Sequence, residues 1–139
     1  MKLPGQPDAA GSPSDWLRHA RSDLALARLA AAREDVLPEQ ACFHAQQAAE
    51  KALKAVLRHA GIQFPLVHDI ETLATLWRTA GHPLPVELTE AAALTPYAVA
   101  YRYPGQPDEV TASDAVEALD LATQAVTWAE RVLGEEPQA

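Results

Sequence analysis

The sequence predicts an all-α protein, a four- to five-helix up-and-down bundle. In its long segments, apolar residues recur at three- and four-residue steps, and Pro or Gly residues separate these segments. No run of alternating apolar and polar residues is long enough for a strand. A chain of 139 residues fits one domain. We therefore expect a flexible N-terminal arm at 1–12, the bundle at 13–134 and a C-terminal tail at 135–139.

The first two expected helices carry clear boundary signals. The first spans 13–34, with Ser12 as its N-cap and Asp15 three residues later, the spacing of a capping box. The second spans 38–60 and ends before Gly61, a residue type that often follows a helix. The short connection between them predicts antiparallel neighbours.

The later helices are shorter or interrupted, except for the last. The third is expected over 68–79, with acidic residues near its positive end. A fourth is expected over 86–94, and Pro96 predicts a kink or break after it. The fifth is expected over 112–133, with Thr111 as its N-cap.

Composition excludes several classes of function. A net charge of −8 argues against a general polyanion binder, and the late acidic excess predicts either contact with a basic partner or simple solubility. The single cysteine, Cys42, excludes an intrachain disulfide and is expected to be a small buried hydrophobe. We find no membrane span, no secretory signal, no phosphate-binding glycine loop and no histidine pair at metal-ligand spacing. We therefore expect a cytoplasmic protein without metal or cofactor.

The second helix has two different sides. Its alanine-rich side predicts close packing, with Leu24 and Leu26 of the first helix filling the space. Its polar side holds Gln46, Glu50, Lys54, Gln47, Arg58, Lys51 and His44. One interpretation is a solvated face with a Glu50–Lys54 ion pair. The other is a surface that contacts another molecule, because Phe43 lies within this polar side.

The stretch "YAVAYRYPG" places Arg102 between Tyr101 and Tyr103. An arginine flanked by aromatic residues can bind a phosphate while the rings stack on a base. In the alternative interpretation, the tyrosine hydroxyls bond to backbone groups and Arg102 pairs with Asp108 or Glu109.

Three segments together resemble the HEPN domain in its small stand-alone prokaryotic form: "CFHAQQAAEKALKAVL", "FPLVHDIETL" and "YAVAYRYPG". The resemblance implies a helical bundle that forms a homodimer. It also implies pairing with a minimal nucleotidyltransferase, often as a toxin–antitoxin pair, and binding of nucleotide or RNA. Some members of this family are metal-independent ribonucleases.

The ribonuclease members use an Arg followed four to six residues later by a His. After Arg102 the corresponding positions hold Pro107, Asp108 and Glu109, so no imidazole is placed as a general base. We therefore expect a non-catalytic partner subunit. Its phosphate contacts would come from Arg102, Lys51, Lys54, His44, Tyr101 and Tyr103, and its chain contacts from Phe43 and Gln47.

Two alternatives remain open at this stage. The chain could be a ribonuclease toxin with a divergent site, in which Arg102 stabilises the phosphate and His44 or His68 comes from another helix. It could also be a purely structural dimerisation module.

Overall fold

The computed structural model describes residues 11–98 and 109–137. This part of the chain is helical and has no strand, which confirms the predicted fold class. Its elements are α1 (Pro13–Ala32), α2 (Pro38–His59), α3 (Ile70–Thr79), α4 (Val86–Glu90), the 3₁₀ helix η1 (Ala91–Ala98) and α5 (Ala112–Leu133).

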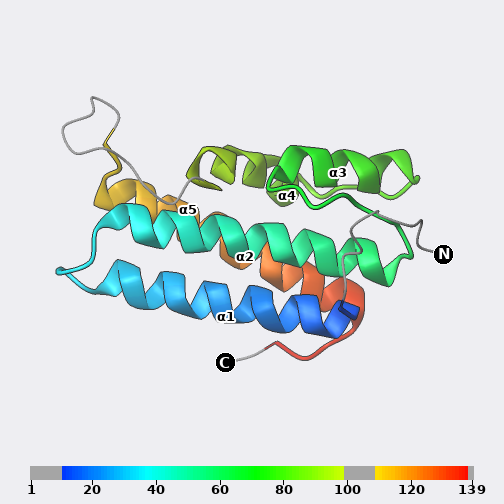
Figure 1. Ribbon diagram of the computed structural model, residues 1–139, viewed down its shortest axis with the longest axis horizontal. Coiled ribbons are helices and arrows are strands. Elements are labelled where there is room, and N and C mark those ends of the chain that lie inside the picture. Colours follow the sequence, from blue (N-terminus) through cyan, green and yellow to red (C-terminus); the bar gives the residue numbers. More distant parts are fainter. Residues whose placement is uncertain (1–10, 99–108, 138–139) are drawn as a thin grey trace.

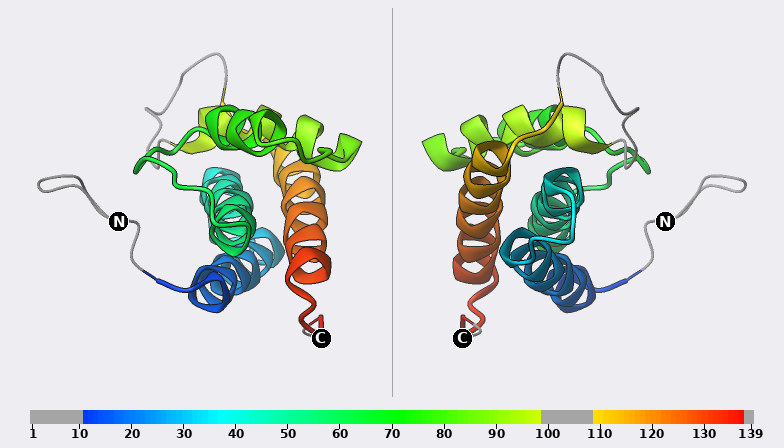
Figure 2. Two further views of the ribbon diagram at one scale, coloured as in Figure 1. Left: turned by 90° about the vertical axis from the view of Figure 1, so that its right-hand side faces the viewer. Right: turned by 90° about the vertical axis from the view of Figure 1, so that its left-hand side faces the viewer.

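Three long helices form the body of the bundle. Figure 1 shows α1 and α2 side by side and antiparallel, with α5 packed behind them. In the end-on views of Figure 2, α3, α4 and η1 form a second layer across α2 and α5. Among the described elements, α2 contacts all but α4. This helix is therefore the central element of the fold.

The predicted helix caps are confirmed. At the start of α1 the Asp15 N–H donates to the Ser12 hydroxyl and the Ser12 N–H to the Asp15 carboxylate, both at 3.0 Å. Thr111 and Asp114 form the same reciprocal capping box at the start of α5. Gly134 ends α5 in the left-handed conformation, with φ of 70°.

Four boundaries differ from the predictions, of which two are the ends of α1 at Ala32 and of α2 at His59, where 34 and 60 were expected. The third helix starts at Ile70 and not at 68, because the Asp69 side chain accepts from the Glu71 N–H at 3.1 Å and so acts as the N-cap. The α-helix expected over 86–94 ends at Glu90. The chain then continues as the tighter 3₁₀ helix η1, which accommodates Pro96 inside it.

Alanines dominate the contacts between the long helices. Leu24 is buried as predicted, but the prediction for Leu26 is wrong, because this side chain is 45% exposed. Cys42 is fully buried, as expected. On α2 the fully buried alanines are Ala41, Ala45, Ala48, Ala49, Ala52 and Ala55. Their small side chains let the neighbouring helices approach α2 closely, so the alanine-rich side builds the bundle.

The end of α5 and the residues after it are attached to α1. Arg21 of α1 forms an ion pair with the buried Glu130 at 2.9 Å and a longer one with Glu135 at 3.6 Å. It also donates to the backbone carbonyl of Glu136 at 2.7 Å. One acidic residue of the late segment is therefore paired inside the bundle and does not contribute to its solvated surface.

Candidate functional site

A strip of half-buried side chains runs along the outer side of α2. It consists of Phe43, His44, Gln47 and Lys51, and we refer to it as the outer strip. Steps of three and four residues place these side chains on one face of the helix. Because α1 and the segment before α3 cover the flanks of α2, the outer strip is only partly open to solvent.

Asp23 of α1 joins the two charged members of the outer strip. Its carboxylate lies 3.2 Å from Nδ1 of His44 and 2.5 Å from Nζ of Lys51. The three side chains are between 14% and 24% exposed. A hydrogen bond to Nδ1 fixes the orientation of the imidazole. Asp23 was not among the site residues predicted from the sequence, although its position beside the buried Leu24, on the flank of an apolar stripe, is itself a signal.

This arrangement changes the electrostatics of the outer strip. The Lys51 ammonium donates one short, charge-assisted hydrogen bond to Asp23, so the charges of the two groups largely cancel. A phosphate that binds Lys51 must compete with this carboxylate. The outer strip is thus close to neutral and carries an aromatic ring, which lies edge-on to His44 with the ring centroids 5.1 Å apart.

Three polar residues of α2, Gln46, Glu50 and Lys54, lie inside the protein. Together with His68, which precedes α3 and whose side chain is 69% exposed, they form what we refer to as the buried polar network. Glu50 accepts from Lys54 at 2.9 Å, lies 3.0 Å from Nδ1 of His68 and accepts from the Gln46 amide at 3.2 Å. Gln46, Glu50 and Lys54 are at most 3% exposed. The predicted Glu50–Lys54 pair is therefore confirmed, but its expected solvation is wrong.

Aromatic side chains close over the buried polar network. The Lys54 ammonium lies 5.3 Å from the ring centroid of Trp16 and 6.0 Å from that of Phe64, within the range of cation–π attraction. Trp16 comes from α1, whereas Phe64 comes from the connection between α2 and α3. The connection also receives a hydrogen bond from Gln46 to the backbone carbonyl of His68, at 3.3 Å. Periodicity on α2 alone could not have revealed this cover.

Gln47 connects the outer strip to the buried polar network. Its amide donates to Oε1 of Gln46 at 2.7 Å. The Gln-Gln pair, which stood out in the sequence, therefore bridges a half-buried and a fully buried polar group. Of the predicted site residues, the structure brings together His44, Gln47 and Lys51, and it separates Lys54 from them by burial.

Arg102, Tyr101 and Tyr103 lie outside the described residues, as does Asp108, so the predicted phosphate contacts there remain predictions. The neighbouring elements are described. The end of η1 and the start of α5 lie at the same end of the bundle as the start of α2 (Figure 1).

The described residues also bear on other kinds of site. Within 11–98 and 109–137, no group of three or more His, Cys, Asp or Glu side chains could hold a metal ion. In the same ranges, no helix has the length and apolar character that crossing a bilayer demands.

Comparison with known proteins identifies relatives of this arrangement. Residues 13–132 match the HEPN domain. TT1696 from Thermus thermophilus is 35% identical, with a TM-score of 0.70, covering 86% of this chain and 97% of that one. ST0689, an archaeal HEPN homologue, is 27% identical with a TM-score of 0.70, covering 88% and 99%. No curated protein sequence matches the chain. Because the match to the HEPN domain extends over nearly all of the bundle, the chain belongs to the HEPN domain family.

Proposed function

We propose that this HEPN protein is a non-catalytic homodimer that acts in the cytoplasm as the partner subunit of a minimal nucleotidyltransferase, in a toxin–antitoxin type of pair. The outer strip is the contact between the two copies. The observation that carries this assignment is the pairing of Lys51 and His44 with Asp23, which leaves a nearly neutral surface around the half-buried Phe43. Surfaces that are depleted in free charge and carry aromatic residues are typical of protein interfaces.

The non-catalytic part of the proposal rests on the histidines. None follows Arg102 in the sequence. His68, one candidate for a recruited base, bonds through Nδ1 to Glu50, which belongs to the buried polar network. Without an imidazole beside Arg102, attack by a ribose 2′-hydroxyl has no evident general base.

One observation favours a second candidate, the ribonuclease with a divergent site. His44 is oriented through Nδ1 by Asp23, at 3.2 Å, in the manner of a histidine base held by a carboxylate. In this alternative His44 takes the proton and Arg102 stabilises the phosphate. Binding of nucleotide or RNA phosphate without cleavage would use Arg102, Tyr101 and Tyr103, with Lys51 and His44 at the rim.

Two measurements test the proposal. Light scattering coupled to size exclusion should give the mass of a dimer for the wild type and for Leu66→Asp, an exposed control, and the mass of a monomer for Phe43→Asp. Co-expression with a nucleotidyltransferase encoded next to this gene should give a complex that survives purification. A Phe43→Asp protein that remains dimeric would refute the assignment of the outer strip.

The catalytic alternative is tested with single-stranded RNA in the absence of metal. The non-catalytic proposal predicts no specific cleavage. Cleavage that is lost in both Arg102→Ala and His44→Gln would establish the ribonuclease instead.

A further inference from the structure

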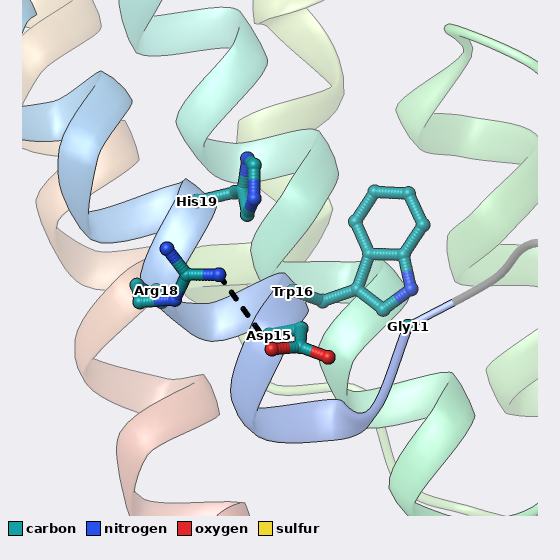
Figure 3. A pocket seen from close by; sticks show the side chains of 5 residues that line it. All are labelled: Gly11, Asp15, Trp16, Arg18 and His19. Carbon is teal, nitrogen blue, oxygen red and sulfur yellow. Dashed lines mark ion pairs between the residues drawn. The ribbon is translucent and has the colours of Figure 1, made fainter.

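A second surface feature lies at the start of α1, away from the outer strip. A hollow of about 480 Å³ is lined there by Gly11, Asp15, Trp16, Arg18 and His19, and we refer to it as the Trp16 hollow. Figure 3 shows these five residues. In Figure 3 the indole of Trp16 extends to one side of Asp15 and the Arg18 side chain lies on the other, with His19 above them. The hollow therefore combines an aromatic surface with polar groups, as small-molecule sites do.

The polar groups of the Trp16 hollow are mainly donors without acceptors. Arg18 is 73% exposed and makes one ion pair, at 3.6 Å to Asp15, which leaves most of its five N–H groups uncommitted. His19 is exposed and has no hydrogen bond within the described residues. The one anionic acceptor, Asp15, already accepts the Ser12 N–H. That hydrogen bond also lowers the pKa of Asp15, so this carboxylate is committed to the helix cap.

Another donor lies at the Gly11 end of the hollow. The indole N–H of Trp16 is buried, and no group in the described part of the chain accepts from it. Such orphan donors are rare in folded proteins. Gly11 covers it with φ of 112°, and a Cβ added there would lie 3.6 Å from Nε1.

We propose that the Trp16 hollow binds a small molecule in which a carboxylate or phosphate group is attached to a planar, apolar group. The oxyanion accepts hydrogen bonds from Arg18 and His19, and the planar group lies against the indole of Trp16. This site is independent of the dimer contact and of the nucleotidyltransferase pairing, because it shares no residue with the outer strip. An oxyanion fits better than a cation because the free groups are donors.

Asp15 provides a test of the sign of the ligand's charge. Its carboxylate lies on the rim of the hollow and repels an anion, so it limits affinity. In Asp15→Asn the side-chain oxygen can still accept the Ser12 N–H, but the negative charge is gone. The substitution should therefore tighten binding of an oxyanion about three-fold, an effect of the size expected for exposed charges.

The experiment follows the indole N–H resonances of the ¹⁵N-labelled full chain. The protein has three tryptophans, and Trp77 donates to the carbonyl of Pro83 at 3.0 Å, which makes its resonance an internal reference. Trp16→Phe identifies the Trp16 resonance. Titration with phenyl phosphate or benzoate should move that resonance to saturation and leave the Trp77 resonance in place.

Matched variants decide the outcome. Arg18→Gln should weaken binding about three- to five-fold, whereas Arg28→Gln, an exposed arginine about 15 Å further along α1, should not change it. Three results would overturn the proposal: no saturable shift at tens of millimolar ligand, equal effects of the two arginine variants, or weaker binding in Asp15→Asn. If inorganic phosphate binds as tightly as phenyl phosphate, the planar group does not contribute to binding and that part of the proposal is wrong.

Discussion

Glu50 is the position at which the buried polar network can be tested most sharply. Its carboxylate accepts hydrogen bonds from three donors, on Lys54, His68 and Gln46, and the Glu50 and Lys54 residues are 1% and 3% exposed. Glu50→Ala leaves the Lys54 ammonium buried beside Trp16 without an anion. Breaking a buried ion pair by removing one partner costs about 3–5 kcal/mol of unfolding free energy.

The same structure predicts that removing both charges is milder than removing one. In Glu50→Leu/Lys54→Met no buried charge is left unpaired, and replacement of a buried pair by apolar side chains is often neutral. The double variant should therefore be more stable than Glu50→Ala. A solvated pair, as the sequence pattern suggested, would be worth only about 0.3–0.5 kcal/mol, so the two descriptions differ about ten-fold in the expected loss.

Urea unfolding followed by circular dichroism measures these differences. A loss of about 4 kcal/mol lowers the urea midpoint by about 2 M when the slope is about 2 kcal/mol per M. Glu117→Ala, on the exposed side of α5, is the matched control and should shift the unfolding free energy by less than about 0.5 kcal/mol. If Glu50→Ala loses less than about 1 kcal/mol, the pair is not buried in solution and the reasoning fails.

Three further predictions concern other charged pairs. Asp23→Asn releases Lys51 from its ion pair, so the affinity for single-stranded RNA measured by fluorescence anisotropy should rise a few-fold and fall with added salt. Arg21→Gln leaves Glu130 buried without its cation, so urea unfolding should show a loss of about 3 kcal/mol. Asp15 has a lowered pKa in the folded protein, caused first by the backbone N–H at the helix start. Its stabilising effect is therefore present above its ordinary pKa of 3.8 and is lost as the pH falls through the lower folded value. The difference in urea midpoint between the wild type and Asp15→Asn should accordingly shrink between pH 5 and pH 2.

Each of these has its own control and its own contrary result. Asp120→Asn removes an exposed carboxylate of α5 and should raise RNA affinity less than Asp23→Asn does. If both variants raise the affinity equally, the effect comes from the net charge of the protein and not from the release of Lys51. Arg28→Gln, on the surface of α1, should leave the urea midpoint nearly unchanged. A pH-independent midpoint difference for Asp15→Asn would mean that the ionised carboxylate does not support the cap.

The helices and their caps could be predicted because they depend on local sequence. Ser12 with Asp15 and Thr111 with Asp114 need only a spacing of three residues. Helix starts and ends shifted by a few residues where a different side chain, such as Asp69, took over the capping role. Pattern and propensity are consistent with the tertiary structure in these places.

The environment of the polar residues could not be predicted in the same way. Gln46, Glu50 and Lys54 have helical spacing that is typical of a wet face, but Trp16 and Phe64 come from distant positions in the chain and cover them. The phase of a helix tells which residues share a face; it does not tell what covers that face. The sequence did indicate that the polar side of α2 is not an ordinary solvated face, because the aromatic residue Phe43 lies within it.

The central position of α2 has a consequence for mutational tolerance. Because this single helix contacts α1, α3, η1 and α5, its turns meet alanine contacts on one side and paired charges on another. A larger side chain in place of a buried alanine pushes the packed helices apart. Replacing a residue of the buried polar network leaves its buried partner without a hydrogen bond. Even conservative substitutions at both kinds of position should therefore destabilise the fold. A library of single substitutions should therefore be depleted most strongly within 38–59. Within that range, the exposed Gln40 and His59 should tolerate substitution best.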